Sequence, residues 1–171
     1  MRKTVSVPKL FAALVCAVIV PTVLLQTVWM LIFVPSSSMA PTLNAGDLLV
    51  GSRRFSEIAR GDIAVFRSES EKTLLIKRVI GLPGDEIRIA NNGTVYVNGE
   101  ALTEPYVQYQ RQGREQTFEV PEGEYLMLGD NRAHSYDSRY WEDPFVPEDS
   151  FVAIEQATIL TLPFFEGDEE T

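Results

Sequence analysis

The chain begins with a long apolar stretch, Leu10 to Val34, which contains no charged residue. At a rise of 1.5 Å per residue, a helix over residues 10–34 would be about 37 Å long, enough to cross a bilayer core of about 30 Å. Pro21 and the polar pair Gln26–Thr27 interrupt the stretch, and a spanning helix tolerates both. We therefore expect a transmembrane helix over residues 10–34.

The alternative is a secretory signal that is removed. The apolar core of such a signal is only about 7 to 15 residues long and ends at a small-residue cleavage site. The stretch here is longer, and no A-x-A pattern precedes its end. Arg2, Lys3 and Lys9 precede it, and the next basic residue is Arg53. The positive-inside rule then predicts that residues 1–9 are cytoplasmic and that everything after the span lies outside.

After Val34 the pattern changes to short apolar, β-branched runs separated by Gly, Pro and Asn. No long stretch there repeats its apolar residues at helical spacing, so we expect a mainly-β domain over residues 35–165. Asn92-Gly93 and Asn98-Gly99 are typical of hairpin turns. The polar segment Gln108–Gln116 reads as a surface loop and residues 166–171 as an acidic tail. The expected strands are Asp47–Gly51, Asp62–Phe66, Thr73–Ile80, Glu86–Ala90, Thr94–Val97, Tyr125–Leu128 and Phe151–Leu162.

Charge and cysteine content narrow the possible partners. Residues 35–171 hold 12 basic and all 24 acidic residues of the chain. Such a domain, without a basic stripe, argues against binding of nucleic acid, because phosphate contacts depend on clustered Lys and Arg. The one cysteine, Cys16, lies inside the apolar stretch, so the sequence offers neither an internal disulfide nor a metal-ligating cysteine pair.

Three serines follow the apolar stretch, between Pro35 and Pro41. The prolines favour extended or turn backbone, which leaves the hydroxyls free to project. A Ser-rich linker is one interpretation. The other is a nucleophile, which requires a base because serine alone is a weak nucleophile. That base is either His134, supported by Asp130 or Asp137, or a neutral lysine.

Lys77 is the lysine candidate. Along the expected strand it shares one face with Leu75 and Val79, and burial among apolar groups lowers the pKa of a lysine from about 10.4. The alternative is that Lys77 lies on an edge strand and extends its ammonium into solvent. The residues alone leave both interpretations open.

Four segments stand in order after the apolar stretch. They are residues 35–43 (PSSSMAPTL), 61–66 (GDIAVF), 77–85 (KRVIGLPGD) and 129–132 (GDNR), the last followed by Ser135, Asp137, Ser138 and Arg139. Together they resemble the sequence boxes of bacterial type I signal peptidase (leader peptidase). The resemblance implies a β-sheet catalytic domain of signal-peptidase type behind one N-terminal transmembrane helix, as in the compact single-span forms of the family. It implies a plasma (inner) membrane enzyme, with its catalytic domain on the outer face, that removes signal peptides from exported preproteins without metal or cofactor. Cleavage would follow a small residue, with a second small residue preferred two positions earlier.

The resemblance also implies the role of each site residue. Ser38 matches the nucleophile and Lys77 the general base, and Ser36 with the backbone N–H of Ser38 matches the oxyanion hole. The supporting residues by the same resemblance are Ser135, which orients the lysine, and the charged pairs Arg78 with Asp130 and Asp137 with Arg139. Strand alternation turns Arg78 away from Lys77, so that Arg78 can pair with Asp130 without adding a cation beside the base.

Two departures from the family pattern stand out. Ala133-His134 occupies the place of the usual Asp-Asn, and the segment between Asp85 and Gly129 is short. A second β-domain is therefore expected to be absent or reduced to a hairpin.

The sequence leaves two competing functions open. One is a specialised processing peptidase with one substrate, and the other is a non-catalytic, membrane-tethered β-module. Leu162–Phe165 is either the end of the core or a lipid-contacting surface.

Overall fold

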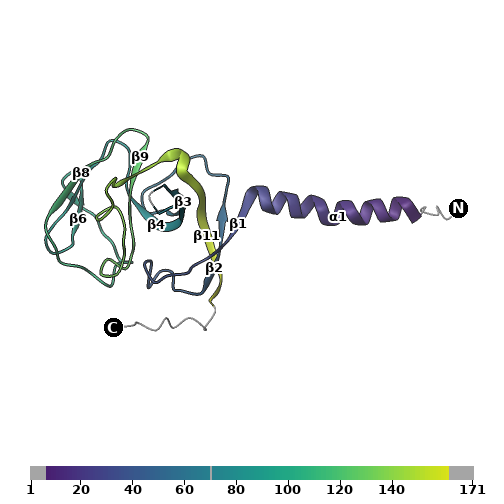
Figure 1. The fold of residues 1–171 in the computed structure, drawn as a ribbon, viewed down its shortest axis with the longest axis horizontal. Coiled ribbons are helices and arrows are strands. Elements are labelled where there is room, and N and C mark those ends of the chain that lie inside the picture. The colour runs from purple at the N-terminus through teal and green to yellow at the C-terminus, as the bar shows by residue number, and fades with distance from the viewer. Residues whose placement is uncertain (1–6, 70, 162–171) are drawn as a thin grey trace.

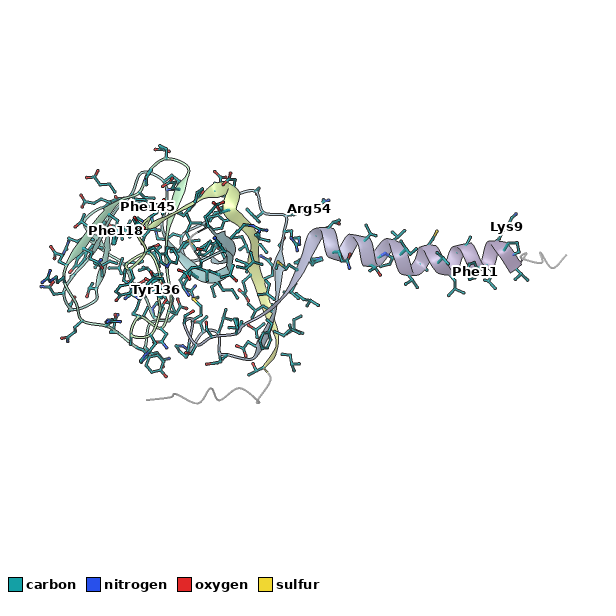
Figure 2. The ribbon with its side chains drawn as sticks, in the orientation of Figure 1. Lys9, Phe11, Arg54, Phe118, Tyr136 and Phe145 are labelled. Carbon is teal, nitrogen blue, oxygen red and sulfur yellow. The ribbon has the colours of Figure 1, made fainter. Side chains whose placement is uncertain are left out.

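A computed structural model describes residues 7–69 and 71–161. Helix α1, Val7–Val28, projects away from a β-rich body that contains the other described elements (Figure 1). Its side chains extend outward around the helix, as Lys9 and Phe11 do in Figure 2. Among the described residues, α1 is the one helix long and apolar enough to cross a membrane. Leu162–Phe165 and the acidic tail lie outside the described residues.

The helix ends earlier than the sequence pattern suggests. The predicted span over residues 10–34 is helical only to Val28, and Trp29–Phe33 form strand β1. Aromatic and β-branched residues in this segment favour a strand. Antiparallel pairing with β2, from Trp29↔Ser52 to Phe33↔Leu48, provides hydrogen-bond partners for its backbone. The remaining 22 residues of α1 still reach about 33 Å. Tertiary pairing, which hydropathy does not report, therefore fixes the boundary.

The larger sheet has seven strands in the order β1-β2-β11-β3-β4-β9-β10, and adjacent strands are antiparallel. The strand predictions after Val34 are confirmed with shifted ends, whereas β1 and the short β10 were not predicted. The bounds are β2 Asp47–Ser52, β3 Ile63–Ser68, β4 Thr73–Gly81, β9 Glu124–Leu128, β10 Phe145–Pro147 and β11 Phe151–Thr161, with a short 3₁₀ turn, Glu148–Ser150, before β11.

A smaller sheet, in the order β7-β6-β5-β8, occupies the far end of the body. Asn98 and Gly99 have φ of 51° and 87°, which fits the predicted hairpin turn because a type I′ turn needs positive φ at both central residues. The sheet exceeds the expected hairpin, since β8 begins at Gln116, the last residue of the predicted loop. Its strands are β5 Glu86–Ile89, β6 Val95–Val97, β7 Glu100–Ala101 and β8 Gln116–Glu119.

Strand β4 is covered on both faces toward its end. Val79 packs in one apolar cluster with Phe66 and Met127, while Ile80 packs in another with Ile87. Side chains alternate along a strand, so successive residues of β4 enter different layers. The two basic residues just before Val79 are consequently buried as well, Lys77 at 4% and Arg78 at 8% exposure.

Candidate active site

The chain folds so that Ser38 and Lys77 meet. Lys77 Nζ lies 2.7 Å from Ser38 Oγ, although the two residues are 39 positions apart. Lys77 comes from the middle of β4, and Ser38 from the turn-rich segment after β1. Ser36 Oγ in turn donates to Ser38 Oγ at 3.4 Å. A hydroxyl, an amine and a second hydroxyl are thus gathered at one point.

Burial controls the ionisation of the amine. Loss of solvent contact is the main cause that lowers the pKa of Lys77 from 10.5 to about 8, and the positive charge of Arg139 contributes in the same direction. The carboxylates of Asp137 and Asp130 act in the opposite direction but do not cancel the effect of burial. A substantial fraction of Lys77 is therefore uncharged at mildly alkaline pH, and a neutral amine can accept a proton from a serine hydroxyl.

The loop formed by residues 129–139 packs against the nucleophile segment. A Cβ at Gly129 would collide with Ser135 Oγ and lie 2.5 Å from the Ser38 carbonyl oxygen, so this position has no room for a side chain. Asp137 accepts a hydrogen bond from the Gly129 N–H at 2.9 Å and forms an ion pair with Arg139 at 2.8 Å. The loop is thus braced from within.

Ser135 does not make the contact that the resemblance implies. Its Oγ is buried and has no hydrogen-bond partner among the described residues, so no Ser135–Lys77 hydrogen bond is present. The hydroxyl instead occupies the space that a side chain at position 129 would need. The structure therefore places Ser135 beside the site but leaves its predicted orienting role without a bond.

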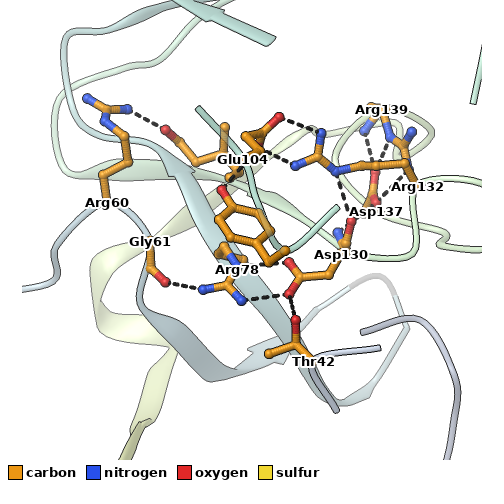
Figure 3. A network of polar contacts seen from close by, with 12 residues as sticks. Thr42, Arg60, Gly61, Arg78, Glu104, Asp130, Arg132, Asp137 and Arg139 are labelled. Atoms are coloured by element: carbon orange, nitrogen blue, oxygen red, sulfur yellow. Dashed lines mark hydrogen bonds and ion pairs between the residues drawn. The ribbon is translucent and has the colours of Figure 1, made fainter. Parts of the chain in front are cut away.

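Arg78 and Asp130 form the predicted pair on the opposite face of β4. Arg78 Nε donates to Asp130 Oδ1 at 2.8 Å and Nη2 to Oδ2 at 2.6 Å, while Nη1 reaches the Gly61 carbonyl at 2.6 Å (Figure 3). Asp130 Oδ2 also accepts the Thr42 hydroxyl at 2.5 Å. This pair therefore joins the segment after Ser38, strand β4 and the 129–139 loop.

Three members of this network were missed in the sequence. Arg132, which is 2% exposed, donates through Nη1 and Nη2 to Glu104 at 3.1 and 2.5 Å, and through Nε to the Gly129 carbonyl at 2.9 Å. Tyr106 donates to Glu104 at 3.1 Å, and its ring lies 3.9 Å from the Arg78 guanidinium carbon. Glu104 and Tyr106 flank Pro105 in an otherwise ordinary loop, and no local pattern revealed their partners.

His134, the competing base, is exposed, and its ring makes no hydrogen bond within the described part of the chain. Its backbone N–H bonds to Asn131. Residues 7–69 and 71–161 contain no cluster of three or more His, Cys, Asp or Glu side chains that could hold a metal ion.

A cleft of about 230 Å³ opens beside the Ser38–Lys77 pair. β1 with the segment that follows it forms one wall, and Leu74–Lys77 of β4 forms another. The lining near Ser38 includes Met39, Val65 and Ile76, so its surface there is mainly apolar.

Comparison with known proteins gives a consistent answer. The family model described as signal peptidase, peptidase S26, matches residues 7–160. The chain is 42% identical over 129 residues to a probable signal peptidase I-2 of Synechocystis sp., an alignment that covers 70% of this chain and 58% of that protein. It is 34% identical over 160 residues to the signal peptidase I of Pseudomonas aeruginosa, covering 68% of this chain and 56% of that protein.

A solved structure shares the fold. The crystal structure of a signal peptidase I from Enterococcus faecalis V583 matches with a TM-score of 0.52 and 32% identity, covering 59% of this chain and 98% of that one. The mainly-β fold behind an apolar N-terminal helix is therefore confirmed. The chain spans little more than half the length of the Synechocystis and Pseudomonas proteins. On the extent of these matches, the chain belongs to the signal peptidase family, peptidase S26.

Proposed function

We propose that this chain is a membrane-bound serine endopeptidase that removes N-terminal signal peptides from exported preproteins through a Ser38–Lys77 dyad. The observation that carries the proposal is the 2.7 Å separation between Lys77 Nζ and Ser38 Oγ, with the pKa of Lys77 lowered to about 8 by burial. Family membership supplies the substrate class, because the matching proteins are named signal peptidases I.

In the acylation step, neutral Lys77 takes the Ser38 proton while Ser38 Oγ attacks the scissile carbonyl carbon. The resulting oxyanion accepts hydrogen bonds from the Ser38 backbone N–H and from Ser36 Oγ, which lies near Ser38 Oγ. Each well-aimed donor of this kind contributes about 3 to 4 kcal/mol to the barrier reduction. Lys77 then passes the proton to the leaving amine, and an ester joins Ser38 to the signal peptide.

Deacylation uses the same groups. Lys77, neutral again, removes a proton from a water molecule that attacks the ester, and Ser38 is regenerated when the proton returns to its oxygen. Arg78, Asp130, Asp137 and Arg139 touch none of the reacting atoms, and the Ser135 hydroxyl forms no hydrogen bond to those atoms. Their role is to hold the 129–139 loop and β4 in place.

The described surface supports attachment to the bilayer. α1 is long enough to span it, and the sheet edge next to α1 is apolar. Leu31 and Phe33 of β1 are 67% and 46% exposed, and Leu160 of β11 is 48% exposed. Phe33 and Leu160 both pair with Leu48, so they share one face of the sheet. With a cytoplasmic N-terminus, this face would rest on the outer surface of the plasma membrane, and the cleft would open near it.

Cleavage of a model preprotein by the full chain in lipid vesicles tests the proposal. Ser38→Ala and Lys77→Ala should each lower kcat by about 10⁴-fold or more, as loss of a catalytic group does in serine proteases. The wild-type kcat/KM should rise with pH as Lys77 loses its proton near its pKa of about 8.

The controls separate the competing functions. His134→Ala should retain wild-type activity, and a dead His134→Ala with an active Lys77→Ala would establish a histidine base instead. A wild type that cleaves none of several unrelated preproteins would favour the binding-module or single-substrate alternatives.

A further inference from the structure

We propose that Asn131 is a positioning residue that aims the backbone N–H of Ser38 at the oxyanion. The proposal rests on the proposed peptidase function and adds a residue that touches no reacting atom. Asn131 is 5% exposed and belongs to the 129–139 loop, directly after Asp130.

Asn131 contacts the nucleophile segment at two consecutive carbonyl groups. Its backbone N–H donates to the Ser38 carbonyl oxygen at 3.1 Å, and its side-chain Nδ2 donates to the Ser37 carbonyl oxygen at 3.2 Å. The other side-chain atom, Oδ1, accepts the His134 N–H at 3.3 Å. The two ends of the amide therefore face a carbonyl acceptor and an N–H donor, an arrangement that fixes its orientation.

The Ser37 carbonyl and the Ser38 N–H belong to one peptide unit. That unit is planar and trans, so its C=O and N–H point in opposite directions. A side chain that holds the Ser37 oxygen on the loop side therefore directs the Ser38 N–H away from the loop. The Ala40 N–H donates to the same oxygen at 3.0 Å, so two donors fix the plane.

The direction of that N–H agrees with the position of the cleft. The cleft is lined by Ser36, Ser38 and residues of β1, β3 and β4, and by no residue of the 129–139 loop. Within the described residues, the Ser38 N–H donates to no acceptor. It is thus free to serve an oxyanion in the cleft, and hydrogen bonds to the carbonyl of the same peptide unit also strengthen its donor character.

Two substitutions separate the donor of Asn131 from its acceptor. Asn131→Asp keeps an oxygen for the His134 N–H and removes the donor to Ser37, while Asn131→Ala removes both. Ala133→Asp is the matched control for Asn131→Asp, because it adds the same charge to the same loop at a residue whose side chain forms no hydrogen bond. Each variant is made in the full chain, reconstituted in vesicles, and assayed with the model preprotein beside wild type and Ser38→Ala.

We expect kcat to fall about tenfold to a hundredfold in both Asn131 variants, less than the 10² to 10³ that complete removal of an oxyanion donor costs. KM should stay within about twofold, because the ground-state carbonyl depends little on the oxyanion hole. A peptide aldehyde, whose adduct with Ser38 carries an oxyanion-like oxygen, should bind more weakly by a factor similar to the loss in kcat. The corresponding peptide alcohol should bind as it does to wild type.

Several results would overturn the inference without touching the proposed function. A wild-type kcat in Asn131→Asp would show that the donor has no role, and equal losses in Asn131→Asp and Ala133→Asp would assign the effect to charge. Aldehyde and alcohol binding weakened alike would indicate general damage to the cleft. If Asn131→Ala does not fold, Asn131→Asp decides alone. An inactive wild type or an active Ser38→Ala would instead refute the peptidase proposal itself.

Discussion

Lys77 and Arg78 are adjacent on β4 and lie on opposite faces of the strand, and their pKa values shift in opposite directions. Lys77 and Arg78 are similarly buried, at 4% and 8% exposure. Arg78 forms an ion pair with the Asp130 carboxylate, and this pair raises the pKa of Arg78 against the opposing effect of burial. Lys77 bonds only to the neutral hydroxyl of Ser38 in the described structure, and burial lowers its pKa to about 8.

The comparison shows that the bonded partner, and not the depth of burial alone, sets the direction in which the pKa of a buried base shifts. A directly bonded carboxylate offsets the loss of solvation at Arg78, whereas the carboxylates near Lys77 act only through space. Strand alternation lets both environments exist one residue apart, since consecutive side chains enter different layers.

Removal of the Arg78 cation, which is paired with Asp130, should have the largest effect on stability. Arg78→Met leaves Asp130, which is 0% exposed, as an unpaired buried carboxylate, and this should lower the free energy of unfolding by about 3 to 5 kcal/mol. Urea unfolding in detergent micelles measures the change. Arg67→Met, at the one exposed position of β3, is the control and should change little. Equal stability of Arg78→Met and wild type would contradict the view that the ion pair braces β4.

Removal of the Lys77 amine, which has no directly bonded carboxylate, should instead raise the free energy of unfolding at neutral pH. In the unfolded chain Lys77 binds a proton up to pH 10.5, but in the folded protein only up to about pH 8. Folding therefore costs free energy below about pH 8, and the unfolding free energy should rise as pH increases from 8 to 10.5. Lys77→Met should be inactive yet more stable at pH 7, by about 3 kcal/mol at most.

Urea unfolding across pH tests this second prediction, with the difference between wild type and Lys77→Met isolating the contribution of Lys77. The stability difference should shrink steadily toward pH 10.5. A difference that stays constant across that range would mean that Lys77 has an ordinary pKa in the folded protein.

Neutralising Asp137 should lower the pKa of Lys77 further, and this effect is expected to be smaller than the previous two. Its carboxylate raises the pKa of Lys77, and Arg139, which it neutralises, lowers it. Asp137→Asn removes the first effect and strengthens the second, so the alkaline rise in kcat/KM should move to lower pH. Asp149→Asn, at an exposed carboxylate outside the site, should leave the profile in place. A profile shifted to higher pH would show that the electrostatic assignment is wrong.

The smallest effect is expected at Tyr106, whose ring lies over the Arg78 guanidinium. Tyr106→Phe keeps the ring over Arg78 but removes the hydrogen bond to Glu104, which should lower the unfolding free energy by about 1 kcal/mol. Tyr96 stacks on Arg88 at the same 3.9 Å and its hydroxyl has no hydrogen bond among the described residues. Tyr96→Phe is therefore the matched control, and equal losses in the two variants would indicate that the Glu104 bond contributes nothing.

The sequence predicted what depends on local pattern. Alternation along residues 73–80 placed Lys77 and Arg78 on opposite faces, and the Asn98-Gly99 turn followed from its two residues. The end of α1 was wrong because Trp29–Phe33 is as apolar as the helix before it, and only its pairing with β2 makes it a strand. The contacts of Asn131 with Ser37 and of Arg132 with Glu104 join residues 94 and 28 positions apart. No periodicity or turn motif encodes such distances.

The junction between α1 and β1 constrains any re-engineering of the anchor. Val28 ends the helix, Trp29 is already paired in the sheet, and the Arg53 N–H bonds to the Val28 carbonyl. No linker residue lies between them to absorb a change in length. Inserting one residue in the last turn would rotate the rest of the helix by about 100° and move it by about 1.5 Å relative to the sheet, while seven residues would nearly restore the original phase. A replacement anchor must therefore match the helical phase of the native one as well as its hydrophobicity.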